Sequence, residues 1–198
     1  MTTLLHPNDI ALASVIMAKA FCTEPFSIYC IPDDSQRLRV LIKHFSALMH
    51  YYQNVYGESY KSEGALKGVC VWEPPIAGGR SEYDIFTELT KVLGPFSFGR
   101  YLKIIDQLDA IRKKEMPVPH WYLALLAVDP IEQCKGIGSA LLQPMLKMAD
   151  VQHMSVYLWT DQPSSIAFYQ KHNFKIATHF IESDSKIAFW TMQRQPMR

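Results

Sequence analysis

The spacing of hydrophobic residues over the first fifty positions predicts two helices. Apolar residues recur at helical intervals over residues 10–21, and either Asn8 or Asp9 is suited to cap the start of that helix. A second helical pattern begins after Ser35 and continues to Met49. We therefore expect the chain to open with two helices.

The pattern then changes to a hairpin that is followed by two more helices. Residues 55–59 and 66–72 are predicted as strands, and the Ser-Glu-Gly sequence at 62–64 supplies the turn between them. Helical patterns return at about 81–93 and 98–115, where a Gly-Pro pair separates them.

The second half of the chain opens on a nearly continuous apolar run at 120–128, which is typical of a central strand covered on both faces. The following segments are predicted as a helix over 136–150, a strand over 156–160, a helix over 163–172 and strands over 174–181 and 187–192. Strands that alternate with helices in this way indicate an α/β fold, with antiparallel pairing in the hairpin regions.

Composition narrows the class of protein. The 198 residues carry a formal net charge of +1, which gives no electrostatic reason to expect nucleic acid or an anionic membrane as a partner. No linker divides the chain, so we expect one domain over residues 1–198. The longest uninterrupted apolar run, 122–128, is too short to cross a bilayer, and the first residues lack the features of a signal peptide.

The four cysteines are scattered, without a CxxC pair or a histidine at zinc-ligand spacing. We therefore expect reduced thiols, no metal, and a cytoplasmic location.

The most informative segment is QCKGIGS at residues 133–139, between the apolar strand and the helix that follows. Glycines allow a tight turn and a close approach of backbone N–H groups to a ligand, and the positive end of the helix favours phosphate. The spacing does not fit a dinucleotide fingerprint, because Leu141 stands where the third glycine belongs, and a P-loop sequence occurs nowhere. The pair of glycines alone also fits a plain strand-to-helix turn.

The wider pattern resembles a known family. Val-Asp-Pro at 128–130, followed by residues 133–138, resembles the acetyl-CoA pyrophosphate motif [QR]-x-x-G-x-[GA] of the GNAT superfamily. About thirty residues later, IAFYQKHNF at 166–174 resembles the second signature of that superfamily. The resemblance covers about 118–182 and is greatest to the puromycin N-acetyltransferase type. It implies a twisted, mixed central sheet with helices on both faces and acetyl-CoA as co-substrate.

The resemblance also implies roles for individual residues. Tyr169 matches the tyrosine that protonates the departing CoA thiolate, although a core aromatic would also fit its position. Gln133 would buttress the phosphate turn, and Gln162 stands near the loop position where the family often has an asparagine that reaches CoA. The residues whose backbone would hold the pantetheine arm are Leu126, Ala127 and Val128, and those whose N–H groups would hold the pyrophosphate are Cys134, Lys135, Gly136, Ile137, Gly138 and Ser139.

Three departures from the family pattern lie near these motifs. Asp161 stands beside Gln162 and would repel a phosphate, Asn173 replaces a family glycine, and Pro144 lies inside the helix after the turn. Asparagine tolerates a left-handed backbone, and the proline should bend its helix without affecting the turn itself.

An amine acceptor must lose a proton, and the family shares no single position for the base. Glu73, His120 and Tyr122 are weak candidates, and each of them is equally suited to a structural role. The helical insertion at 81–116 and the helix near 35–50 are expected to form the acceptor wall. The aromatic residues that could shape it are Phe45, Tyr51, Tyr52, Tyr83, Phe86, Phe96, Phe98 and Tyr101.

The resulting hypothesis is an N-acetyltransferase that transfers the acetyl group of acetyl-CoA to a primary amine by direct attack in a ternary complex. The acceptor would be a small-molecule or peptide amine, and a homodimer is left open. The alternative is a non-catalytic acyl-CoA-binding or regulatory domain of the same fold, while an NAD- or ATP-binding protein is disfavoured by the glycine spacing.

Overall fold

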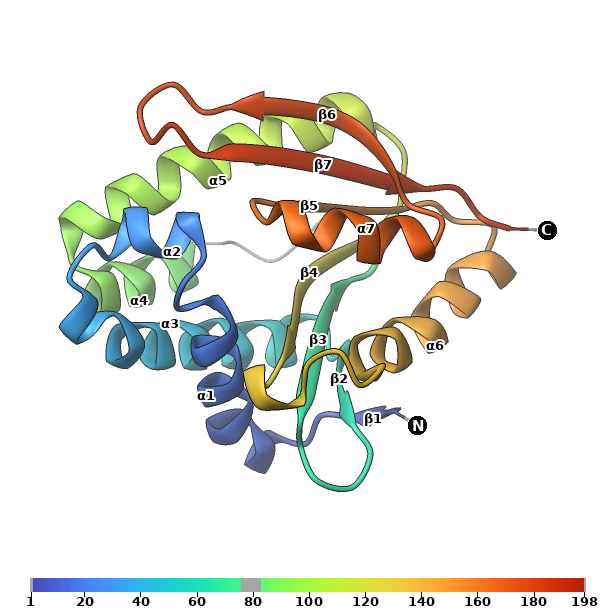
Figure 1. Ribbon diagram of the computed structural model, residues 1–198, viewed down its shortest axis with the longest axis horizontal. Helices are drawn as coiled ribbons and strands as arrows, with labels where there is room; N and C mark the ends of the chain where they lie inside the picture. The colour runs from blue at the N-terminus through green and yellow to red at the C-terminus, as the bar shows by residue number, and fades with distance from the viewer. Residues whose placement is uncertain (1, 76–82, 198) are drawn as a thin grey trace.

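The computed structural model describes residues 2–75 and 83–197, which form a mixed α/β fold (Figure 1). The strands are β1 (Thr2–Leu4), β2 (Ser59–Ser62), β3 (Gly68–Glu73), β4 (Trp121–Val128), β5 (Val156–Thr160), β6 (Lys175–Ile181) and β7 (Ala188–Arg194). The helices are α1 (Ile10–Phe21), α2 (Pro25–Cys30), α3 (Asp34–Val55), α4 (Tyr83–Leu93), α5 (Pro95–Glu115), α6 (Ile137–Val151) and α7 (Pro163–Lys171). Two short 3-10 turns, η1 (Pro7–Asp9) and η2 (Pro130–Glu132), precede α1 and follow β4.

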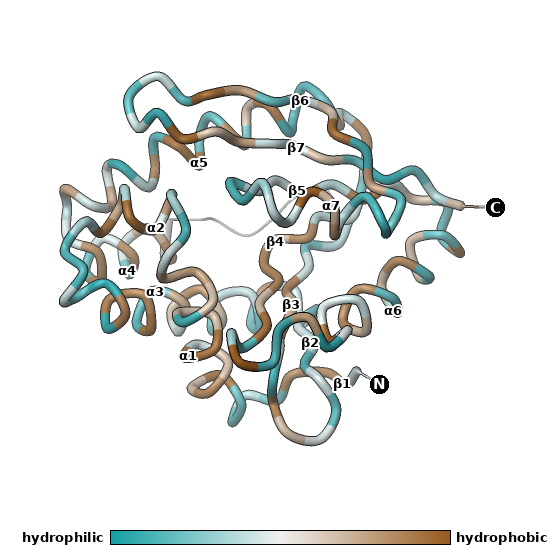
Figure 2. Tube along the Cα trace, in the orientation of Figure 1, coloured by the Kyte–Doolittle hydropathy of each residue, from teal (hydrophilic) through white to brown (hydrophobic). Residues whose placement is uncertain are grey.

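The described strands form one seven-stranded sheet in the order β1-β2-β3-β4-β5-β7-β6. Its neighbours are antiparallel except for β4 and β5, which are parallel. Hydrophobic residues follow β4 along most of its length in Figure 2, as expected for a central strand. The predicted α/β class, with a mixed sheet flanked by helices, is confirmed.

Alternation along β3 explains why both faces of the sheet are covered. Val69 and Val71 are fully buried in the cluster that α1 and α3 contribute. Cys70 and Trp72 point to the opposite face, where they are buried with the apolar side of α6. Because successive side chains of a strand point to opposite faces, one strand contributes to two cores.

The parallel pair β4 and β5 is short. Only Trp121 with Val156 and Tyr122 with Tyr157 are paired among the described residues. On the other side of β4, the partner of β3 changes from Leu125 to Leu123 between neighbouring residues, so one residue of β4 bulges out of the ladder. The strands therefore diverge after two residue pairs, and most of β4 has a free hydrogen-bonding edge on the side of β5.

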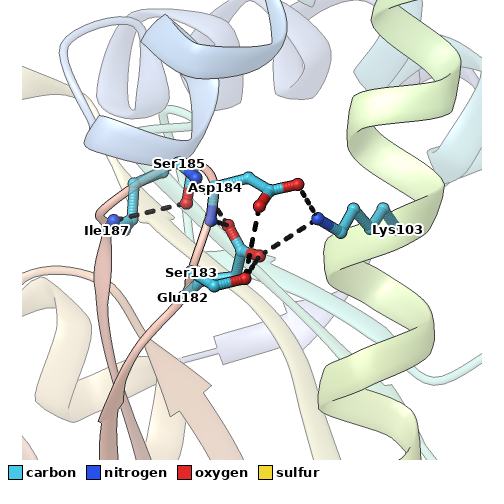
Figure 3. A network of polar contacts seen from close by, with 6 residues as sticks. All are labelled: Lys103, Glu182, Ser183, Asp184, Ser185 and Ile187. Atoms are coloured by element: carbon cyan, nitrogen blue, oxygen red, sulfur yellow. Dashed lines mark hydrogen bonds and ion pairs between the residues drawn. The ribbon is translucent and has the colours of Figure 1, made fainter.

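Helix α5 covers the other half of the sheet and is tied to the β6–β7 hairpin. Its Lys103 forms ion pairs with Glu182 and Asp184 in the hairpin loop (Figure 3). The Glu182 carboxylate, 2% exposed, also accepts hydrogen bonds from the backbone N–H groups of Asp184 (3.1 Å) and Ser185 (2.6 Å). Burial by itself raises the pKa of Glu182, but these hydrogen bonds and Lys103 outweigh burial and lower it to about 2.

Two predicted details near the N-terminal half are wrong. Residues 55–59 are not a strand, because α3 continues to Val55 and β2 begins only at Ser59. Tyr56 is the C-cap residue of α3, and its ring packs back on the helix, with the ring centroids of Tyr52 and Tyr56 5.9 Å apart. Asp9 precedes α1 without capping it; its carboxylate accepts the His6 N–H and pairs with Lys61 at 2.7 Å.

The predicted helix boundaries elsewhere are close to those observed. Pro95 and Pro163 each stand in the first turn of their helices, where the missing N–H group is not needed. Pro144 lies inside α6, and Asn173 has the left-handed backbone expected of it, with φ 65°. Within residues 2–75 and 83–197 no helix is both long and apolar enough to span a membrane.

Candidate active site

The turn between β4 and α6 is built to present backbone N–H groups. Gly136 stands at the helix N-cap with φ 80° and ψ 1°, a left-handed conformation that favours glycine. Gln133 braces the turn, since its side-chain amide donates a hydrogen bond to the Val128 carbonyl at 3.3 Å. Lys135 folds back on η2, where its ammonium donates to the Ile131 carbonyl and to Glu132, each at 3.1 Å.

The start of α6 has no side-chain cap. Its first N–H groups therefore have no partner within the helix. A Cβ added at Gly138 would come within 3.2 Å of the Phe168 ring, which means that the two sequence motifs are in direct contact. Exposed N–H groups at the positive end of a 15-residue helix fit a phosphate. The residues present therefore fit the pyrophosphate of CoA.

A small polar cluster lies beside this turn, between the first residues of α6 and His172. The Ser139 hydroxyl lies 3.0 Å from His172 Nε2, and the Gln143 amide lies 3.5 Å from Nδ1 of the same ring. Burial lowers the pKa of His172, so the imidazole is neutral near pH 7. The cluster connects the start of α6 to the end of α7.

A cavity of about 240 Å³ lies at the other end of the free edge of β4. Five consecutive residues of β4, from Tyr122 to Leu126, line it, together with residues of α1, α2, α3, α4, α5 and α7. None of residues 133–139 contributes to its wall. A ligand that follows β4 would thus have its phosphates at α6 and its other end at the cavity. Ala127 packs instead into the core beside α1, and Val128 lies beside the turn.

Tyr169 lines this cavity from α7. Its ring contacts Phe168 at 5.2 Å and Phe174 at 5.7 Å between centroids, so packing fixes its direction. Burial, and then the nearby Glu24 and Cys70, raise the pKa of Tyr169 well above its usual range. The phenol therefore keeps its proton at neutral pH. Gln162, the N-cap residue of α7, donates its backbone N–H to Thr160 and makes no side-chain cap.

Two carboxyl groups that the sequence analysis did not select as catalytic meet in the cavity wall. Glu24, between α1 and α2, and Asp161, directly after β5, share a hydrogen bond. Asp161 is 4% exposed and accepts the Phe26 N–H at 2.8 Å. Burial raises the pKa of both, and Asp161 raises that of Glu24 further, because two neighbouring carboxyl groups resist a second negative charge. At neutral pH the pair therefore retains a proton.

The position of Asp161 corrects the expectation that it would repel a phosphate. Its carboxylate is turned toward Phe26 and Glu24 in the cavity wall. The sequence carried only weak signals for this pair. Glu24 is a charged residue in an apolar stretch, and Asp161 stands at the carboxyl end of a strand that is parallel to its neighbour, where functional side chains often gather.

The three candidate bases that the sequence predicted lie in different places in the structure. Glu73 and Tyr122 line the cavity, whereas His120 is not among its lining residues. Glu73 accepts a hydrogen bond from the Tyr52 hydroxyl at 3.1 Å and pairs with Arg112 at 2.9 Å. The same guanidinium lies 4.3 Å from the centre of the Tyr122 ring. This group of four residues is a tightly paired network in one wall.

His120 and Tyr122 are also held in ways that suit structure. The His120 Nδ1 atom lies 2.7 Å from the Val118 carbonyl, and burial lowers its pKa. Burial raises the pKa of Tyr122, with a further contribution from Glu73. A neutral histidine outside the cavity and a phenol that retains its proton are poorly placed to take a proton from an acceptor there.

The predicted acceptor wall is only partly in place. The aromatic residues of the prediction that line the cavity are Phe45, Tyr51, Tyr52, Phe86 and Tyr101. Phe96 is 72% exposed, and Phe98 packs behind the wall against Phe86 and Tyr101. The side chain of Tyr83 lies outside the described residues.

Comparison with known proteins explains this arrangement. Residues 98–174 match the model of the acetyltransferase (GNAT) family, a segment that contains the phosphate turn and ends at Phe174. A solved structure from Corynebacterium glutamicum, described as histone acetyltransferase HPA2 and related acetyltransferase, has a TM-score of 0.75 at 20% identity, over 100% of this chain and 97% of the other. The fold is that of the GNAT acetyltransferases.

Two further proteins, one matched by sequence and one by structure, are similar to this chain. A Schizosaccharomyces pombe protein described as uncharacterized N-acetyltransferase C550.08 is 22% identical over 97% of this chain and 82% of its own length. A mosquito structure described as arylalkylamine N-acetyltransferase like 5b has a TM-score of 0.65 at 13% identity, over 98% of this chain and 99% of the other. The family match covers residues 98–174, and the fold is shared over nearly the whole chain. Within the described residues no group of three or more potential ligands is arranged to hold a metal.

Proposed function

We propose that this protein is an acetyl-CoA-dependent N-acetyltransferase that acts by direct transfer in a ternary complex. The observation that carries the proposal is the position of two sites at opposite ends of one free strand edge. The uncapped N-terminus of α6 fits a pyrophosphate, and the cavity at the bulge of β4 holds Tyr169 and the Glu24–Asp161 pair. The match of residues 98–174 to the GNAT family and the amine acetyltransferase among the structural neighbours support the same function.

Acetyl-CoA would supply the acetyl group as a thioester. Backbone N–H groups of residues 134–139 would bind its pyrophosphate, and the free edge of β4 at Leu126 and Val128 would pair with the pantetheine amides as an added strand pairs. Gln133 would hold the turn in shape through its bond to the Val128 carbonyl.

The proposed chemistry needs one proton acceptor and one proton donor. The Glu24–Asp161 pair would attract the ammonium form of the acceptor and take its proton, because a pair with raised pKa binds that proton well near neutral pH. The amine nitrogen then forms a bond to the thioester carbon, and the carbon–sulfur bond breaks. Tyr169 would give its hydroxyl proton to the departing sulfur, and the second proton that the amine nitrogen loses as the amide forms would pass through water to the phenolate.

In this scheme Glu73 has a structural role in the cavity wall. Its two oxygens are occupied by Arg112 and Tyr52, so it holds the cavity wall rather than an acceptor proton. The finer resemblance to the puromycin N-acetyltransferase type stays a prediction, and the volume of about 240 Å³ favours an acceptor more compact than puromycin.

The proposal is tested by thiol release from acetyl-CoA with a panel of primary amines that includes puromycin. We expect amine-dependent release with at least one compact amine and a mass increase of one acetyl group on its nitrogen. Binding of acetyl-CoA without release for any amine would contradict the enzyme and favour a non-catalytic acyl-CoA-binding domain.

A further inference from the structure

One polar side chain in the cavity has no partner. His44 of α3 is 6% exposed and lines the cavity, and its Nδ1 atom is buried without a hydrogen-bond partner among the described residues. A buried nitrogen without a partner costs free energy on the order of 1–3 kcal/mol, so such a group in a binding cavity calls for a ligand atom.

The residues around His44 restrict the chemistry of that ligand. The imidazole is held edge-on between Phe45 and Tyr101, at 5.2 and 5.3 Å between centroids. Burial lowers the pKa of His44 to about 4, so the ring is neutral at pH 7 and offers one donor and one acceptor. A neutral ring does not repel an ammonium group elsewhere in the cavity.

A continuous row of rings connects His44 to the carboxyl pair. Tyr101 stacks on Phe26 at 5.7 Å, and the Phe26 N–H donates to Asp161. Two ring-to-ring contacts therefore separate the polar nitrogen of His44 from the group that would take the acceptor's proton. A molecule with an amine at one end and a polar group at the other would contact both ends of this row of rings.

We propose that His44 determines acceptor specificity by hydrogen bonding to a hydroxyl group at the far end of a short, apolar primary amine. The inference rests on the proposed function for the position of the amine at Glu24 and Asp161. It adds a second recognition point to the one at the carboxyl pair.

The test compares tyramine with phenethylamine, which differ only by the hydroxyl group. Affinity is measured by calorimetry in the presence of CoA, so that no turnover occurs. We expect tyramine to bind about tenfold more tightly to the wild-type protein, since phenethylamine leaves the imidazole unpaired. In His44→Phe the two amines should bind within twofold of one another, through loss of tyramine affinity. His44→Gln, which keeps a donor and an acceptor, should restore part of the preference.

The matched control is His50→Phe on the same helix, since His50 is exposed. Its preference for tyramine should equal that of the wild type. Equal affinity of the wild-type protein for both amines, or a preference that His44→Phe retains, would overturn the role of His44. Binding of neither amine would overturn the acceptor class. The proposed function fails by a different result, in which tyramine binds but acetyl-CoA releases no thiol.

Discussion

At the scale of single residues, Tyr169 is the side chain whose hydroxyl and ring can be separated experimentally. Tyr169→Phe keeps the contacts with Phe168 and Phe174 and removes only the proton donor. Because a positioned general acid contributes about 10²–10⁴-fold, kcat should fall within that range while acetyl-CoA affinity stays unchanged. Steady-state kinetics and calorimetry measure the two effects. Tyr60→Phe, which removes a phenol outside the cavity, is the control; a kcat within twofold of wild type in Tyr169→Phe would contradict the acid role.

Asp161 offers a second test at this scale, because asparagine keeps the oxygen that accepts the Phe26 N–H. Asp161→Asn should lower kcat/KM by about 10²–10⁴-fold, since one of the two carboxyl groups that would take the proton becomes an amide. The pKa of Glu24 falls in this variant, because the charge and hydrogen bond of Asp161 are gone, although burial still raises it. The acidic limb of the pH–rate profile should then report Glu24 alone and lie at a different pH from that of the wild-type pair. Asp34→Asn, at an exposed carboxylate, is the control; an unmoved acidic limb would exclude the pair.

At the scale of elements, the connection from β4 to α6 decides whether a phosphate can bind. Gly136→Asp places a Cβ in a left-handed backbone and a negative charge at the helix start. Acetyl-CoA at a hundred times its Kd should stabilise the wild-type protein by about 2.7 kcal/mol, and this stabilisation should be absent from the variant. Thermal unfolding with and without acetyl-CoA measures it. A Gly64→Asp control changes another left-handed glycine in the β2–β3 turn, and equal stabilisation of Gly136→Asp would show that the phosphate lies elsewhere.

At the scale of the whole molecule, the contacts of Glu182 join α5 to the β6–β7 hairpin (Figure 3). Its pKa of about 2 lies below the usual value of 4.5, so the ionised group contributes stability above pH 4.5 that is lost as the pH falls toward 2. Glu182→Gln should lower the free energy of unfolding by about 1–3 kcal/mol at pH 7. Urea unfolding at pH 7 and pH 3 should show a smaller difference between the two proteins at pH 3. Glu88→Gln, an exposed carboxylate on α4, is the control, and a difference independent of pH would contradict this assignment.

Much of the second half of this molecule could be predicted because its signals are local. The strand, the glycine turn and the helix after it are contiguous, and Tyr169 lies in a sequence motif whose Phe168 contacts Gly138. The Glu24–Asp161 pair could not be predicted, because it forms only when the end of β5 meets a segment 135 residues away, at Phe26. The incorrect strand at 55–59 has a local cause: Val55 ends α3, and the chain turns at Gly57 with φ 70° before β2 begins at Ser59.

The short pairing of β4 with β5 divides the sheet into two half-sheets that meet at two residue pairs. One half, β1 to β4, leads into α6 and its phosphate turn, and the other, with β5, leads into α7, Asp161 and Tyr169. The proposed phosphate turn thus lies in one half of the molecule, and Asp161 and Tyr169 lie in the other. A cofactor that lies along β4 and reaches Tyr169 would contact both half-sheets. Its binding would therefore also hold the two halves of the protein together.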